Sequence, residues 1–289
     1  MEKKISIILL TYNSSLYKTF LTIESILRQN FDDFELIVSD DGSLQNNYDE
    51  IENFFKYMGV STYKFVNNSV NQGTVKNFLS ALKVAEGKYI RGMSPGDLFY
   101  TDKSLSYIYE GMEKYNGKIG FGKFQSYSFD VAEEKIQLKH YIWPKNKFIY
   151  SKEFRYVDMT PYIFSGDSIS GASLFYRKDF LEEILFEFKD KVIYTEDLSR
   201  ILAIIKREKF VAINKVLFWY EYGQGISTNG NKEWKKKIQQ DYENFNVLLT
   251  EKYGECQTAQ KYLDIQKIIA IKNAWKRRIK LCFKEPGIF

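Results

Sequence analysis

The 289-residue sequence predicts an α/β fold, in which a mostly parallel sheet flanked by helices is followed by a helical C-terminal region. Over the first 100 residues, short apolar β-branched runs alternate with amphipathic segments at the spacing of βαβ units. Hydrophobic residues make up 44% and charged residues 27% of the chain, which is typical of a globular protein with enough apolar material for a core. Polar loops follow three of the predicted strands, where open α/β sheets bind their ligands.

Four predicted strands form the first half of the sheet, and their apolar residues show little alternation with polar ones. These strands are expected at residues 4–11, 34–39, 63–66 and 88–93. Such runs are typical of strands that are covered on both faces. The segments between them have helical periodicity: Val75, Phe78 and Leu82, for example, share one face of the third helix, which stops at Gly87.

The pattern is less regular after about residue 115. Further strands are expected near 119–129, 171–177 and 214–220, and helices near 178–187 and 196–207. Residues 232–283 show helical periodicity, and we expect the helical region to end at Pro286 and Gly287. We find no internal repeat and no low-complexity linker.

One histidine and two cysteines limit the chemistry that the chain can support. A histidine-based zinc site and a disulfide framework are not expected from His140, Cys256 and Cys282 alone. We interpret His140 as a surface or packing residue. The sequence has no run of about 18 apolar residues that would predict a membrane span. Its first residues lack the apolar stretch of a secretion signal, so we expect a cytoplasmic protein.

The net charge of +5 is concentrated near the C-terminus. Residues 270–289 carry six Lys or Arg and one acidic residue, so residues 1–269 are formally neutral. A neutral body argues against a broad nucleic-acid-binding face. The basic, amphipathic segment can lie on an anionic membrane surface. Packing on the rest of the chain, or dimerisation, is an equal alternative.

Several common site motifs are absent from the sequence. There is no Gly-x-Gly-x-x-Gly after the first strand, no phosphate loop, and no Gly-x-Ser-x-Gly elbow. The dinucleotide, triphosphate and acyl-serine chemistries that use these motifs are therefore not expected. What remains at the predicted strand ends is mainly carboxylate and amide, at 11–13, 40–41 and 94–97.

The order of these motifs resembles one enzyme family. Residues 7–13 (Ile-Ile-Leu-Leu-Thr-Tyr-Asn) and 35–43 (Glu-Leu-Ile-Val-Ser-Asp-Asp-Gly-Ser) are similar to the opening of family 2 glycosyltransferases with the GT-A fold. Asp97 stands where that family keeps its metal-binding aspartate motif. Glu196-Asp197 resembles the later Glu-Asp motif of the family. The similarity is dense over the first 100 residues and sparser to about residue 228.

The resemblance implies a GT-A fold, the Rossmann-like mixed sheet of nucleotide-diphospho-sugar transferases. Residues 1–228 would form the catalytic domain, with 1–100 as its nucleotide-binding half and 101–228 as its acceptor half. Residues 229–289 would be a C-terminal helical region with the basic tail. Within the acceptor half, Asp158, Tyr162 and Asp167 are candidate acceptor contacts. Residues 223–227 are either a loop that closes over the donor or a plain turn.

The resemblance also implies the role of each candidate site residue. The nucleotide sugar would be bound by Thr11, Tyr12, Asn13, Asp40, Asp41, Lys76 and Ser94. Among these, Asp40 would contact the pyrimidine base and Asp41 would support the loop. Asp197 would be the general base, with Glu196 beside it on donor or acceptor. Without the resemblance, the better interpretation of Glu196-Asp197 is a solvated helix start whose acids complement the helix dipole.

One departure from the family pattern concerns the metal. The usual Asp-x-Asp-Asp run is replaced by Ser94-Pro95-Gly96-Asp97, so the ribose-contacting carboxylate is missing and Asp97 is the one candidate ligand for Mg²⁺ or Mn²⁺. In such chemistry a cation neutralises the departing diphosphate while a carboxylate deprotonates the acceptor hydroxyl. A single displacement inverts the anomeric centre.

We therefore expect an inverting, metal-assisted glycosyltransferase. Its donor would be a nucleotide sugar, with a UDP-sugar favoured. Its acceptor would be a glycan or a lipid-linked glycan in cell-surface polysaccharide synthesis, presented at the inner face of the membrane. The alternatives are a catalytically weakened sugar- or nucleotide-binding paralogue, suggested by the lost aspartates, and a nucleotidyltransferase.

Overall fold

The computed structural model describes residues 3–130, 135–139, 144–161, 167–223, 225, 228 and 230–269. The strands of this part of the chain form one mixed sheet in the order β3-β2-β1-β4-β9-β6-β10-β5, with β7 paired to β6 and β8 paired to β10. The strands are β1 (Ile5–Thr11), β2 (Phe34–Asp40), β3 (Tyr63–Asn67), β4 (Tyr89–Met93), β5 (Leu98–Phe99), β6 (Ile119–Asp130), β7 (Lys135–Lys139), β8 (Phe154–Val157), β9 (Leu174–Arg177) and β10 (Phe210–Glu221).

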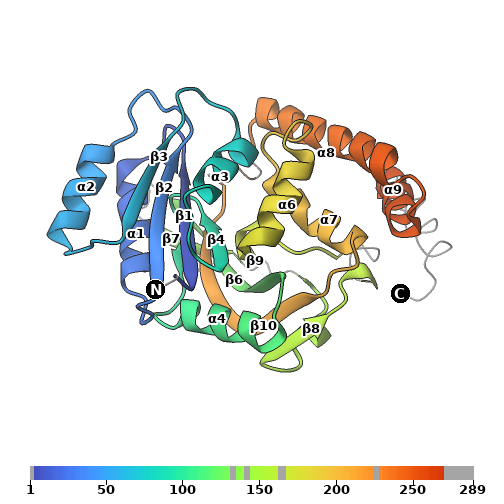
Figure 1. The fold of residues 1–289 in the computed structure, drawn as a ribbon, viewed down its shortest axis with the longest axis horizontal. Helices are drawn as coiled ribbons and strands as arrows, with labels where there is room; N and C mark the ends of the chain where they lie inside the picture. The colour runs from blue at the N-terminus through green and yellow to red at the C-terminus, as the bar shows by residue number, and fades with distance from the viewer. Residues whose placement is uncertain are drawn as a thin grey trace.

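Helices cover both faces of the sheet. The α-helices are α1 (Leu16–Leu27), α2 (Tyr48–Tyr57), α3 (Thr74–Leu82), α4 (Ser104–Tyr115), α6 (Lys178–Phe188), α7 (Ser199–Ile205), α8 (Lys232–Tyr253) and α9 (Gln257–Ile269). Short 3₁₀ turns lie at η1 (Lys147–Tyr150), η2 (Gly171–Ser173) and η3 (Glu196–Leu198). Figure 1 shows α1 and α2 on one side of the sheet and α3, α6 and α7 on the other.

Two apolar cores explain why the first strands lack polar alternation. Ile5, Ile7 and Leu9 of β1 pack with α1, α2 and α4 in one buried cluster. Ile8 of the same strand faces the other cluster, with α3, α6 and α7. Because helices bury both faces of β1, apolar side chains are favoured at successive positions. The predicted α/β fold with helices on both faces of a central sheet is confirmed.

Strand direction decides which loops share an edge of the sheet. β1 pairs in parallel with β2 and β4. β9 is antiparallel to both β4 and β6, so β6 runs in the same direction as β4, and β10 is parallel to β6. The carboxyl ends of β1, β2, β4 and β10 therefore lie along the same edge.

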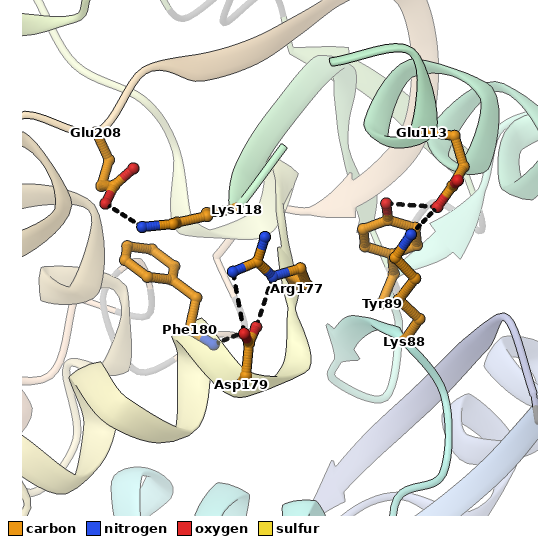
Figure 2. A network of polar contacts seen from close by, with 8 residues as sticks. All are labelled: Lys88, Tyr89, Glu113, Lys118, Arg177, Asp179, Phe180 and Glu208. Atoms are coloured by element: carbon orange, nitrogen blue, oxygen red, sulfur yellow. Dashed lines mark hydrogen bonds and ion pairs between the residues drawn. The ribbon is translucent and has the colours of Figure 1, made fainter. Parts of the chain in front are cut away.

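The opposite edge is held by a polar network. Figure 2 shows Lys88 and the Tyr89 hydroxyl directed at Glu113, and Lys118 directed at Glu208. Arg177, at the end of β9, forms a two-pronged ion pair with Asp179. These groups come from the starts of β4 and β6 and their neighbours, away from the polar loops. We assign them a structural role.

Four expected elements differ in detail from the structure. The expected strand at 171–177 is η2 followed by the shorter β9, and the expected helix at 196–207 is η3 followed by α7. β10 begins at Phe210 rather than near 214, and its register with β6 shifts between Ile213 and Val216 and again between Val216 and Phe218. The expected helix at 232–283 is two helices, α8 and α9, up to residue 269.

The described part of the C-terminal region packs on the same core as the sheet. Phe245 and Leu249 of α8 and Tyr262 and Ile265 of α9 are buried in the cluster that contains α6 and α7. The basic segment 270–289 lies outside the described residues. Among the residues described, no helix is both long and apolar enough to span a bilayer.

Candidate active site

Four polar segments meet at the carboxyl ends of β1, β2, β3 and β4. We call this edge the strand-end site, comprising residues 11–13, 40–44, 71–76 and 94–97. Thr11 lies opposite Asp40 in the parallel pairing of β1 and β2. The Thr11 hydroxyl donates a hydrogen bond of 2.8 Å to Asp40 Oδ2. The fold thus brings together the loops that the sequence predicted to be functional.

Asp40 is buried, and its carboxylate accepts three hydrogen bonds from neighbouring residues. Besides Thr11, the Ser43 amide and hydroxyl each donate to it at 2.7 Å. A carboxylate offers about four acceptor positions, so one remains for a ligand. The Asn13 amide donates to the Ser43 hydroxyl at 2.7 Å, which ties the first two loops together. Tyr12 beside them is 45% exposed.

Asp41 holds the turn that leads into α3. Its carboxylate accepts hydrogen bonds from the amides of Gln72 at 3.0 Å and Gly73 at 2.7 Å. Gly73 has a φ of 88°, and a Cβ there would lie 2.2 Å from Ile193 Cγ2. Only glycine suits this position, because the backbone is left-handed and the neighbouring segment is in contact. The turn is therefore fixed between β2 and residue 193.

Lys76 lies in the first turn of α3. Its ammonium is 3.6 Å from the Asp190 carboxylate, and both side chains are largely exposed. Exposed pairs of this kind contribute little to stability. Val75, its neighbour, donates its amide to the Ile193 carbonyl at 3.0 Å.

Asp97 lies in the loop after β4 and is 9% exposed. Burial raises the pKa of its carboxyl to about 7, although the nearby Arg91 guanidinium works in the opposite direction. The Glu221 amide donates to Asp97 Oδ1 at 3.3 Å. Ser94, at the start of this loop, is exposed and accepts the Asp97 amide at 3.0 Å through its carbonyl. A carboxyl with such a pKa in a loop of this kind is a candidate functional group.

The loop around Asp97 is fixed from two sides. Tyr127 of β6 donates its hydroxyl to the Gly96 carbonyl at 2.6 Å, and the Gly96 amide donates to Thr22 Oγ1 of α1 at 2.9 Å. Gly96 has a φ of 103°, and a Cβ would lie 2.2 Å from Glu221 Oε2. The sequence reasoning missed Tyr127 and Glu221. Glu221 ends a parallel strand, so the strand-end argument could have found it.

The Glu221 carboxylate is already neutralised. Lys18 of α1 donates to its two oxygens at 2.7 and 2.8 Å. No group of three or more His, Cys, Asp or Glu suited to a metal ion occurs among the described residues. Asp97 still fits as a single protein ligand, because Mg²⁺ is commonly held by one or two carboxylates while substrate phosphates supply the rest.

The acidic pair Glu196-Asp197 lies in η3, directly before α7. Asp197 is partly exposed and forms an ion pair with the buried guanidinium of Arg200. Burial, and next the Asp197 charge, raise the pKa of Glu196 to about 8. The raised pKa favours the protonated form of Glu196 at neutral pH.

The acidic pair is joined to β4 through η2. A Cβ at Gly171 would lie 2.7 Å from Asp197 Cβ, so these two segments are in contact. The buried Arg91 of β4 donates to the Ala172 carbonyl at 2.6 Å and the Leu174 carbonyl at 2.8 Å. Arg91 thus links the strand that leads to Asp97 with the segment that touches Asp197.

The contacts described above connect, one after another, the segments that carry Asp40, Asp197 and Asp97. Asp41, next to Asp40, holds Gly73, and Val75 in the following turn bonds to Ile193. Residues 193–195 lead into Asp197, which meets η2. Arg91 then connects η2 to the loop of Asp97. The acids are distant in the sequence, and a continuous series of contacts joins their segments in the fold.

The weaker acceptor candidates make local contacts. Asp158 accepts the Thr160 amide at 2.8 Å, and Asp167 accepts the amides of Lys145 and Asn146 at 2.7 and 3.0 Å. Tyr162, His140 and residues 224, 226 and 227 lie outside the described residues.

Comparisons with known proteins agree with this arrangement. The sequence model of the family described as Glycosyl transferase family 2 matches residues 6–185. An uncharacterized glycosyltransferase of Mycoplasma genitalium, MG025, is 26% identical over 238 residues, which cover 81% of this chain and 73% of that protein. The Escherichia coli protein WfgD, a UDP-Glc:α-D-GlcNAc-diphosphoundecaprenol β-1,3-glucosyltransferase, is 25% identical over 247 residues, with 81% and 83% covered.

Solved structures share the fold. Residues 1–349 of S. aureus TarS, crystallised with UDP-GlcNAc, superpose with a TM-score of 0.64 at 18% identity. The match covers 90% of this chain and 70% of that one. The crystal structure of the same TarS fragment described without a ligand gives a TM-score of 0.61 over 99% of this chain.

Proposed function

This chain belongs to glycosyl transferase family 2, and we propose that it transfers a sugar, with inversion, from a UDP-sugar to a hydroxyl of a glycan or lipid-linked glycan. The observation that carries the proposal is the strand-end site with Asp40 and Asp97, to which contacts through residues 193–195 and through η2 connect the segment of Asp197. The printed activities of the relatives support the donor and acceptor classes, since WfgD uses UDP-Glc and a diphosphoundecaprenol-linked sugar. Synthesis of cell-surface polysaccharide, at the cytoplasmic face of the membrane, is the corresponding role.

The nucleotide would bind at the loops after β1 and β2. The one unoccupied acceptor position of Asp40 suits an N–H of the uracil ring. Thr11, Asn13 and the exposed ring of Tyr12 surround the base and ribose in this proposal. Asp41 contributes indirectly, because it fixes the turn at Gln72 and Gly73 that precedes Lys76. Lys76, from the first turn of α3, and Ser94, from the loop after β4, face the diphosphate in this proposal.

The diphosphate would lie near Asp97. This carboxylate would hold Mg²⁺ or Mn²⁺, and the ion would neutralise the charge that builds on the leaving diphosphate. The pKa of about 7 for Asp97 supports this role, because a buried carboxyl with little compensation is the kind of group that a cation stabilises in its charged form. Because Glu221 is already paired with Lys18, Asp97 would be the carboxylate that binds the metal ion.

Asp197 would remove the proton from the acceptor hydroxyl. Arg200 fixes the orientation of its carboxylate, and its partial exposure gives an acceptor access. Glu196, with its raised pKa of about 8, would carry a proton and donate a hydrogen bond to a sugar hydroxyl. Attack from the side opposite the diphosphate in one displacement inverts the anomeric centre.

A panel of UDP-sugars tests the proposal. The full chain is incubated with UDP-glucose, UDP-N-acetylglucosamine and other UDP-sugars in the presence of Mn²⁺, and UDP release is measured together with UDP binding. We expect release from at least one donor, abolished by Asp97→Ala. Undiminished release by that variant would contradict the role of Asp97.

One observation favours a second candidate function. Only Asp97 remains of the family's aspartate run, which suits a protein that binds nucleotide sugars without transferring them. Tight UDP binding without release from any donor would support this alternative. Release of diphosphate from UTP and a sugar phosphate would instead indicate a nucleotidyltransferase.

A further inference from the structure

A buried aspartate in the C-terminal region contacts the segment that precedes the acidic pair. Asp241 lies on α8 and is 2% exposed. Its Oδ1 accepts the Ile193 amide at 3.0 Å, and its Oδ2 accepts the amides of Tyr194 at 2.6 Å and Thr195 at 3.0 Å. The Thr195 hydroxyl adds a fourth bond of 3.1 Å. One carboxylate therefore holds three successive residues immediately before Glu196.

The acidic pair depends on such support from outside. It lies in η3, a turn of three residues, and the Thr195 side chain makes no capping hydrogen bond to that turn. So short a turn has few hydrogen bonds of its own to fix its position. Charge-assisted bonds to backbone amides are roughly twice as strong as neutral ones. The four bonds to Asp241 are thus the main restraint on the N-terminal side of the pair.

The same turn of α8 also contacts the residue that pairs with Asp197. Tyr242, the next residue, is hydrogen-bonded to Arg200, which forms the ion pair with Asp197. Adjacent residues of α8 therefore contact both the segment entering η3 and the cation that orients its second acid. Neither contact involves the strands that carry the nucleotide-binding loops.

We propose that Asp241 is a positioning residue for the acidic pair, so that α8 is a part of the catalytic unit rather than an appendage. The inference rests on the proposed role of Asp197 as the base. A base must lie within hydrogen-bond reach of the proton that it removes. A displacement of about 1 Å can cost about a hundredfold in rate. Loss of the Asp241 contacts should therefore lower kcat.

The test compares two substitutions on the same helix. Asp241→Asn keeps the size of the side chain but replaces one acceptor oxygen by a donor that opposes the backbone amides. Asn244→Ala is the matched control, since Asn244 donates to the Lys191 carbonyl at 2.9 Å, one turn along α8 and just before the held segment. UDP release from the most active UDP-sugar of the panel, UDP affinity by calorimetry and Tm are measured on the full chain.

We expect Asp241→Asn to lower kcat about tenfold to a hundredfold while UDP affinity changes less than about threefold. Asn244→Ala should lower Tm but leave kcat within about twofold of wild type. Thr195→Val removes one of the four bonds with little change in shape, and it should give a smaller kcat loss of the same kind. It keeps the test decisive if Asp241→Asn does not fold.

Two outcomes would overturn the inference alone. One is a wild-type kcat in Asp241→Asn, or in Thr195→Val if only that variant folds, while Asp197→Asn is inactive. The other is an equal kcat loss in Asn244→Ala. In either case the proposed function would stand. If the wild-type chain released no UDP from any donor, the proposed function itself would fail, and the two failures are therefore distinguishable.

Discussion

Gly171 and Asp197 are in such close contact that a methyl group at position 171 would lie 2.7 Å from Asp197 Cβ and 2.9 Å from its Oδ2. Glycine at this position lets η2 pack directly on the proposed base. We predict that Gly171→Ala displaces Asp197 and lowers kcat for UDP release about tenfold or more, with UDP affinity retained. Steady-state kinetics and calorimetry on the same preparation check this.

A steric control separates displacement of Asp197 from general destabilisation. Gly111 of α4 is also close-packed, since a Cβ there would lie 2.9 Å from Ile213 Cδ1 and 3.0 Å from Phe154 Cδ1. Overpacking of this kind costs about 1–3 kcal/mol. Gly111→Ala should lower Tm without lowering kcat. Equal kcat in Gly171→Ala and Gly111→Ala would contradict a special role for the Gly171 contact.

The charged Asp97 carboxylate should lower the free energy of unfolding at neutral pH, although the proposed metal site requires it. Its pKa is about 7 in the folded protein, above the ordinary value of 3.8. Between these values the folded state binds more protons than the unfolded state, so the free energy of unfolding falls as pH rises, and the loss is complete above about pH 7. Asp97→Asn should therefore raise Tm at pH 7.5, by about 2–6 °C, and abolish UDP release.

The pH dependence provides the check on this explanation. At pH 5 Asp97 is protonated in the folded wild type, so Asp97→Asn should change Tm much less than at pH 7.5. Thermal melts of both proteins at the two pH values give the comparison. An equal or larger Tm difference at pH 5 would show that burial of the charge is not the cause.

Lys18 and Glu221 should be energetically coupled. Their ion pair joins α1 to the end of β10, and Glu221 is nearly buried whereas Lys18 is partly exposed. Lys18→Met would leave a buried carboxylate unpaired beside Asp97, which is more costly than removing both charges. We predict that Lys18→Met lowers the free energy of unfolding by about 1–3 kcal/mol, and that adding Glu221→Gln restores part of the loss.

Urea denaturation of the two single variants and the double variant measures this coupling. If the effects of the single substitutions simply added, the ion pair would have no net role in the stability of this edge. UDP affinity, measured in parallel, should fall in Lys18→Met because the unpaired carboxylate lies near the proposed diphosphate position.

Binding of anionic membranes by the basic segment 270–289 can be tested against its equal alternatives, packing on the rest of the chain or dimerisation. The segment can be removed after Ile269, where α9 with its buried Tyr262 and Ile265 ends. A chain ending at Ile269 should bind phosphatidylglycerol vesicles more weakly than the full chain by about tenfold or more, since each basic residue contributes about 1 kcal/mol. Vesicles of phosphatidylcholine serve as the control. Equal flotation of both chains would exclude the tail as the anchor.

The sequence was sufficient to predict the features that are local in the chain. Apolar runs followed by Thr11, Asp40 and Asp97 are readable as buried strands with polar ends, and parallel pairing then places those ends together. The early start of β10 was not predicted. The polar residues Asn214 and Lys215 interrupt the apolar pattern of the strand, and the structure places them at a bulge.

The contacts that orient the site were missed because they join distant segments. Lys18 and Glu221 are 203 positions apart, and nothing local marks them as partners. Asp241 did carry a signal, since it shares the helical spacing of Phe245 and Leu248 and so lies on the apolar face of α8. A carboxylate on an apolar face must have partners, although the sequence does not identify them.

The central claim is that Asp197 acts as the base for a UDP-sugar held at the strand-end site. Asp197→Asn preserves the shape of the side chain but removes its ability to accept a proton. The most direct test measures UDP release from the best donor and UDP affinity for this variant and the wild type. We predict unchanged UDP affinity and a loss of release of at least about a hundredfold. Release at the wild-type rate by Asp197→Asn would contradict the account.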